Sequence, residues 1–115
     1  MAAIGSVNVS GGGDAKAVAA ALARILGQPA PTFTGDNWPV KVTEDVTTYV
    51  EDDRPEENDG YEVDIDVWSW PGREATEAAT AEVYDLLVRK TDWSLRLLTV
   101  GGAPIAHRPA VTRAS

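Results

Sequence analysis

The chain has 115 residues, contains no cysteine and carries a formal net charge of −8 at pH 7. Its 43% hydrophobic and 24% charged residues predict one globular domain rather than a disordered or membrane-embedded chain, and the lack of cysteine excludes disulfides and thiolate metal sites. No signal-peptide pattern or long apolar run is present, so we expect the protein to stay in the cytoplasm or in a particle assembled there.

The first predicted element covers residues 4–9, IGSVNV, which can form either a short edge strand or an ordered arm. The three glycines at 11–13 indicate a hinge directly after it. We therefore expect an N-terminal arm or edge strand in residues 1–13, a single α+β domain in residues 14–111, and a C-terminal tail in residues 112–115.

The next segment, AKAVAAALARIL at residues 15–26, predicts a helix that begins after Asp14 as N-cap and ends at Gly27. The stretch that follows, residues 27–39, holds three prolines and two glycines and predicts an ordered loop. One face of the helix is apolar because its large side chains recur at helical spacing, at Val18, Leu22, Ile25 and Leu26.

Two strands are predicted next, in residues 40–50 and 61–70, and we expect them to pair as a hairpin. The first has its drier face at even positions and the second at odd positions. The two dry faces therefore coincide only when the numbers of paired residues add up to an odd value. A sum near 111, with Val50 beside Tyr61, or a register shifted by two residues satisfies this condition.

Pro71 and Gly72 break the second strand, and residues 73–90 predict a helix with small side chains early and leucines late. Residues 93–100 and 104–111 then predict a terminal hairpin, whose second strand contains two prolines and is confined to an edge. The order (β)αββαβ(β) predicts an α+β fold, with an antiparallel-type sheet and both helices on one face.

Negative charge is concentrated between Glu44 and Asp66, where eleven acids and one base, Arg54, give a net charge of −10 and leave +2 for the rest of the chain. This distribution lacks the basic footprint that phosphate-backbone binding needs, so it argues against a specific nucleic-acid reader. We expect the segment to meet a basic partner or a cation, or to face something that it must not bind. The candidate acidic surface comprises Asp45, Glu51, Asp52, Asp53, Glu56, Glu57, Asp59, Glu62, Asp64 and Asp66.

Glu62, Asp64 and Asp66 alternate along one strand face and would lie about 6.6 Å apart. Neighbouring charges at this spacing repel by about 0.6 kcal/mol in water but by about 2.5 kcal/mol at an effective dielectric of 20, so we expect the row to be wet. It is either a plain solvated face or a functional acidic surface. No metal or cofactor is expected, because the nearest calcium-loop alignment places Pro55 where the first Asp should stand.

Trp68 and Trp70 fall on the same face as the acids by their even numbering. Tryptophan is favoured at protein interfaces, so both are candidates for a contact between subunits. Packing within the chain, beneath the loop at residues 28–39, is the other interpretation. No catalytic signature accompanies these residues, and we do not predict an enzyme.

The run WPVKVTEDVTTYV at residues 38–50, followed by a polar loop and YEVDIDVWSWPGREATEAATAEVYDLLV at residues 61–88, resembles tail terminator, or tail completion, proteins of long-tailed bacteriophages and related prophages. The shared features are a proline-led strand, a strand that ends in a Trp-Ser pair, a break containing glycine and an alanine-rich helix. The resemblance covers about residues 14–100, and the chain departs from it in the acidic loop at residues 51–60 and in its N-terminal arm.

The resemblance implies a structural virion protein that is assembled in the host cytoplasm, without membrane association, into a ring, usually a hexamer. Such a ring caps the tail tube protein, contacts the head-tail connector proteins and lets DNA pass without specific binding. The acidic hairpin would face the DNA channel, where it would repel phosphate, or a basic neighbouring protein. An acidic binding module, such as an immunity or inhibitor protein or a DNA mimic, is the alternative from another class, and a small ferredoxin-like monooxygenase is a third.

Overall fold

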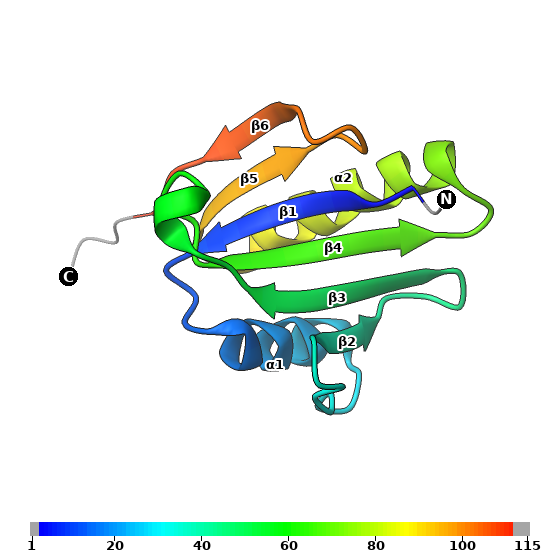
Figure 1. Ribbon diagram of the computed structural model, residues 1–115. Helices are drawn as coiled ribbons and strands as arrows, with labels where there is room; N and C mark the ends of the chain where they lie inside the picture. The colour runs from blue at the N-terminus through cyan, green and yellow to red at the C-terminus, as the bar shows by residue number, and fades with distance from the viewer. Residues whose placement is uncertain (1–2, 112–115) are drawn as a thin grey trace.

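The computed structural model describes residues 3–111 and contains one six-stranded sheet in the order β2-β3-β4-β1-β5-β6, in which all neighbours are antiparallel (Figure 1). The α+β fold expected from the sequence is therefore confirmed. The elements are β1 (Gly5–Ser10), α1 (Ala15–Leu26), β2 (Trp38–Lys41), β3 (Val46–Asp52), a 3-10 turn η1 (Pro55–Glu57), β4 (Val63–Ser69), α2 (Arg73–Lys90), β5 (Ser94–Leu98) and β6 (Pro104–Arg108).

Both helices begin and end where the sequence predicts. The side chain of Asp14 accepts a hydrogen bond from the backbone N–H of Ala17, with an N–O distance of 2.9 Å, and so caps α1. Gly27 ends this helix in the left-handed conformation, with φ of 69°. The first half of α2 approaches the sheet closely, because a Cβ at Gly5 would overlap the side chain of Thr80.

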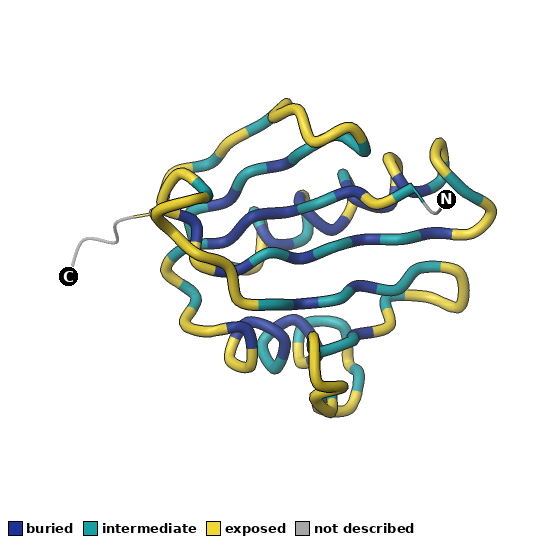
Figure 2. The backbone as a smooth tube through the Cα atoms, in the orientation of Figure 1, coloured by how far each residue is buried: buried dark blue, intermediate teal, exposed yellow. Residues whose placement is uncertain are grey.

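The helices share one face of the sheet, with α1 over β2 and β3 and α2 over β4, β1 and β5. Along the strands, buried residues alternate with half-buried ones (Figure 2), which is the period-two pattern of a sheet with one packed face. The buried side chains form a single core that includes Val7, Val9, Val18, Leu22, Val50, Val63, Ile65, Val67, Val83, Leu87 and Leu95. The other face of the sheet, which we call the open face, carries the polar side chains.

β1 lies at the centre of the sheet, between β4 and β5, so the expected arm or edge strand is wrong. Val7 and Val9 are fully buried on the helix side. The glycine run after them forms a short connection to α1. A Cβ at Gly12 would come within 2.8 Å of the Trp93 ring, so the run is needed for close packing as well as for turning. The glycines indicated a hinge after an ordered arm or edge strand, whereas four of the six residues of β1 are buried.

The segment predicted as one strand, residues 40–50, is divided into β2 and β3 by a reversal over Val42–Asp45. The backbone N–H of Val42 donates to the carbonyl of Val46, with an N–O distance of 2.9 Å, and closes the turn. A continuous strand would have placed Glu44 on the dry, even-numbered face. Burial of an unpaired carboxylate is costly. The chain therefore turns at the position where a continuous strand would bury Glu44.

The pairing of β3 with β4 sets Val50 opposite Ile65 and Tyr49 opposite Asp66. The paired numbers add up to 115, so the expected odd parity is confirmed, while the register differs by four residues from the expected 111. The longer connection accommodates η1 and its turn. This register places Glu51 directly opposite Asp64, which decides the electrostatics of the open face.

Candidate functional site: a carboxyl cluster on the open face

Each acid of the row formed by Asp64 and Asp66 of β4 and by Glu62, just before this strand, receives a hydrogen bond from a polar side chain of β1. Three donor–acceptor pairs cross the two strands: Ser6 Oγ to Asp66 Oδ1 at 3.1 Å, Asn8 Nδ2 to Asp64 Oδ1 at 2.8 Å, and Ser10 Oγ to Glu62 Oε1 at 3.0 Å. The even-numbered Ser-Asn-Ser pattern of β1 was the signal for this match. Sequence reasoning missed it because β1 was expected at an edge.

Glu51, Asp64 and Asp66 converge, with one carboxyl oxygen from each lying within 4.8 Å of the others. All three are half-buried rather than wet, so the expectation of a fully solvated row is wrong for Asp64 and Asp66, while Glu62 is exposed. The reason is the central position of β4, which has β1 on one side and β3 on the other. We call this group the carboxyl cluster.

Three ionised carboxylates at this spacing would repel one another strongly, by roughly 4 kcal/mol per pair at 4 Å and an effective dielectric of 20. Burial, together with the hydrogen bond and negative charge of Asp66, raises the pKa of Asp64 to about 9. The Asp64 carboxyl is therefore protonated at neutral pH and shares its proton within the cluster. Burial and the charge of Asp66 also raise the pKa of Glu51, with smaller contributions from Asp53 and Asp36.

The carboxyl cluster is also the group among residues 3–111 that could hold a metal ion, a possibility that the sequence did not predict. It offers three oxygen ligands, whereas Ca²⁺ takes six to eight. A cation would have to displace the proton of Asp64. Convergence of acids without further ligands does not by itself make a metal site.

The acidic loop between β3 and β4 is held against the sheet by Arg96, whose side chain is 15% exposed. Its guanidinium forms an ion pair with Asp59 at 2.6 Å and donates to the side-chain oxygens of Asn58 at 2.7 Å and Asn8 at 2.9 Å. It also lies 4.7 Å from the centre of the Tyr61 ring. The sequence gave no indication of these contacts of Arg96, because Arg96 lies 37 residues beyond Asp59.

The other predicted acids are separated by the fold. Asp52 accepts a hydrogen bond from the backbone N–H of Ala15 at 2.8 Å and so helps to fix α1, and Asp53 accepts one from Asn58 at 2.9 Å. Glu56 and Glu57 are exposed on η1. Asp45 is exposed in the turn between β2 and β3, away from the loop. The ten candidate acids therefore form a three-residue cluster, an exposed loop and scattered surface charges rather than one surface.

Trp68 and Trp70 lie at the end of β4. Trp68 is half-buried and lines a shallow cavity of about 610 Å³ with Ile4, Pro71 and Val100 among its other walls. Trp70 follows the strand and is 64% exposed. Packing under the loop at residues 28–39, the other interpretation of the sequence, does not account for the exposed Trp70.

Comparison of the chain with protein-family models, curated proteins and solved structures gives no significant match. In the described part of the chain, neither helix is long and apolar enough to cross a membrane.

Proposed function

We propose that the protein is a structural subunit of a bacteriophage tail that, like the tail terminators it resembles, assembles into a ring at the end of the tail tube. The observation that carries the proposal is the division of the molecule into two unlike faces: the helices pack on one side of the sheet, and the open face keeps its carboxylates and Trp68. An open sheet face next to the exposed Trp70 is suited to contacts between identical subunits.

The acidic loop supports a role beside DNA or beside a basic neighbour. Glu56 and Glu57 are exposed on η1, and Arg96 pairs with Asp59 at the base of the loop. Six copies would surround a channel with negative charge, so DNA would pass without specific binding because phosphate is repelled. The tail tube protein and the head-tail connector proteins are the partners that this function requires, in the virion tail.

The mass of the purified protein in solution tests the ring. We expect native mass spectrometry to show a closed oligomer, a hexamer in the family that the chain resembles, and electron micrographs to show rings at the same concentration. A monomer that persists throughout the micromolar range would contradict the proposal.

A second candidate function is an acidic binding module that covers a basic protein, as an immunity protein or a DNA mimic does. The favouring observation is that Arg96 and Asn58 hold the loop in one conformation, so its acids are placed before a partner arrives. A stable monomer that forms a one-to-one complex with a basic nuclease, and loses it when Glu56 and Glu57 are changed to Gln, would favour this function over the ring.

A further inference from the structure

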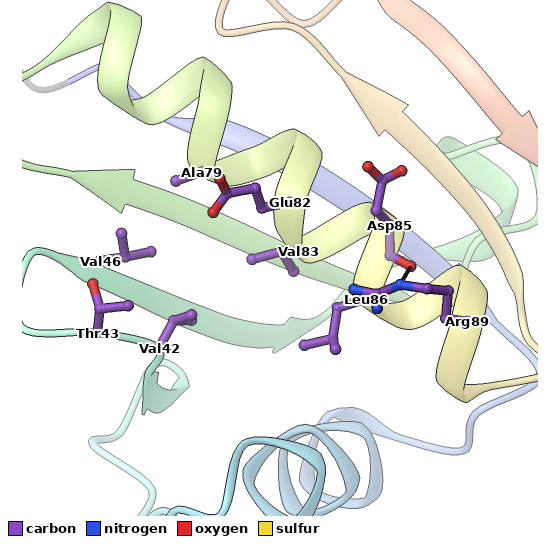
Figure 3. Close-up of a pocket in the computed structure, with 9 residues that line it drawn as sticks. All are labelled: Val42, Thr43, Val46, Ala79, Glu82, Val83, Asp85, Leu86 and Arg89. Carbon is purple, nitrogen blue, oxygen red and sulfur yellow. Dashed lines mark hydrogen bonds between the residues drawn. The ribbon is translucent and has the colours of Figure 1, made fainter.

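An apolar groove lies on the helix side of the sheet, between α2 and the turn that joins β2 to β3 (Figure 3). Its volume is about 300 Å³, at the lower end of the range of about 300–1,000 Å³ typical of ligand sites. This is room for one or two aliphatic side chains. The apolar walls come from Val42 and Val46 on one side and from Ala79, Val83 and Leu86 of α2 on the other.

α2 packs mainly on β4, β1 and β5, and the groove lies where this helix passes the turn between β2 and β3. The small side chain of Ala79 forms part of the α2 wall. Val42, Val46 and Leu86 remain half-buried although they have no polar atom in their side chains. An occupant that covered them would gain about 25 cal/mol for each Å² of apolar surface removed from water.

The rim of the groove is mainly acidic, because Glu82 and Asp85 of α2 both line it and Arg89 is the one positive group among its lining residues. Glu82 is exposed, and Figure 3 shows its carboxylate on the side of α2 that faces Val46. Thr43 lines the same end and is followed in the turn by the exposed Glu44 and Asp45. The opposite end holds Arg89, whose Nε donates to the backbone carbonyl of Asp85 at 3.3 Å.

The carboxylate of Glu82 is not neutralised by an ion pair within residues 3–111. Glu82 takes part in none of the three ion pairs found among residues 3–111, which join Arg54 to Glu57, Arg73 to Glu77 and Arg96 to Asp59. Asp85, which also lines the groove, offsets part of the charge of Arg89, so a cation approaching the groove is attracted most strongly to the Glu82 end. An anion would meet one positive side chain, Arg89, beside two carboxylates.

We propose that this groove binds an apolar segment of a partner protein that carries Lys or Arg beside its apolar side chains. The aliphatic side chains of the segment lie against Val42, Val46, Val83 and Leu86, and its ammonium or guanidinium group meets Glu82 next to the acidic turn. The groove is on the opposite side of the sheet from the carboxyl cluster, so this binding site is separate from the function proposed for the open face.

The proposal is tested with n-hexylammonium, which combines an aliphatic chain with a cationic head, and with hexanoate, which has a similar chain and the opposite charge. Methyl spectra from NMR report on the valines and leucines of the groove. We expect hexylammonium to shift the methyl signals of Val42, Val46, Val83 and Leu86 in a saturable manner. Hexanoate should bind more weakly.

Glu82→Gln should lower the affinity for hexylammonium by about two- to fivefold, the loss expected for one exposed ion pair. Glu74→Gln, an exposed change in the first turn of the same helix, is the matched control and should leave the affinity unchanged. The absence of saturable shifts at the groove, equal binding of hexanoate, or an unaltered affinity in Glu82→Gln would each overturn the proposal.

Discussion

The side chain of Asn8 donates a hydrogen bond to Asp64 across the pairing of β1 with β4, with an Nδ2–Oδ1 distance of 2.8 Å. Its own oxygen accepts from Nε of Arg96 at 2.9 Å. Asn8 is only 2% exposed, so its side-chain amide is shielded from bulk water. It connects the carboxyl cluster to Arg96, the residue that holds the acidic loop. Removal of either neighbour leaves a buried polar group without a partner.

The stability of the protein should depend on pH through Asp64. Its pKa is about 9 in the folded state and close to the ordinary value of 3.8 when the chain is unfolded. The folded state thus binds more protons between these values, and the free energy of unfolding falls as pH rises from about 4 to 9. The slope is at most about 1.4 kcal/mol per pH unit, reduced because the side chain is only half-buried.

Asp64→Asn isolates this contribution, because the amide resembles the protonated carboxyl in shape and cannot ionise. We expect the variant to equal or exceed the wild type in stability at pH 7 and to exceed it clearly at pH 9. Urea unfolding at pH 5, 7 and 9 measures the difference, with Glu56→Gln, an exposed change on η1, as control. Parallel pH profiles for wild type and Asp64→Asn would show that Asp64 is ionised at neutral pH.

Asn8→Ala should destabilise the fold by about 1–3 kcal/mol, because Asp64 and Arg96 each lose a hydrogen bond in a buried setting. Ser10→Ala removes a comparable bond to Glu62 at the exposed end of the same strand. The control should therefore change stability by no more than about 0.5 kcal/mol. Equal losses of unfolding free energy in the two variants would mean that the hydrogen bonds of Asn8 stabilise the protein no more than an exposed hydrogen bond does.

Arg96→Met should release the acidic loop while keeping an unbranched side chain of similar length. Hydrogen bonds to charged groups contribute about 1.5–3 kcal/mol each, so we expect a lower unfolding free energy and faster amide exchange in residues 53–60. Arg54→Met, which breaks an exposed ion pair with Glu57, serves as the control and should leave exchange unchanged. Unaltered exchange in Arg96→Met would show that the loop is held by its own turn.

Gly5→Ala should destabilise the protein by about 1–3 kcal/mol, because the added Cβ overlaps the side chain of Thr80 and forces α2 away from the sheet. Thr80→Ala removes the hydroxyl and methyl groups that the Cβ added at residue 5 would overlap. The double variant should then lose less stability than the sum of the two single changes, as measured by a double-mutant cycle. Additive losses would mean that the Cβ added at residue 5 does not interact with the side chain of Thr80.

Trp70→Ala tests the proposed ring at a single exposed side chain. Because Trp70 is 64% exposed, its removal should leave the melting temperature of the monomer almost unchanged. If Trp70 anchors a contact between subunits, the oligomer should dissociate at concentrations where the wild type stays assembled. Sedimentation velocity on both proteins gives the comparison, with Ile105→Ala as a second exposed apolar change. An oligomer that stays assembled in Trp70→Ala at the same concentrations would remove Trp70 from the interface.

Local signals predicted the helices well, because caps such as Asp14 and Gly27 and the apolar spacing act within a few residues. Parity of the β3–β4 pair was predictable for the same reason, since it follows from alternation alone. Register was not, because the length of the loop containing η1 sets it. The carboxyl cluster depends on that register, and so could not be inferred from the alternation of Glu62, Asp64 and Asp66.

The central position of β1 was not predicted from the sequence, because it depends on pairing with strands that are distant in the sequence. Nothing near residues 5–10 in the sequence indicates that they insert between strands that start at residues 63 and 94. The Ser-Asn-Ser alternation matches the acids of β4 only once the two strands are known to be neighbours. Arg96 and Asn8 are likewise 88 residues apart and meet only through this topology.

The central place of β1 also determines the order in which the fold can be completed. The pairs β2–β3, β3–β4 and β5–β6 join strands that are close in sequence, so they can form as soon as each hairpin is made. β1 must instead wait for partners more than 50 and almost 90 residues later. Contacts of this separation slow folding, and the two halves of the sheet are joined only when β1 has paired with both β4 and β5.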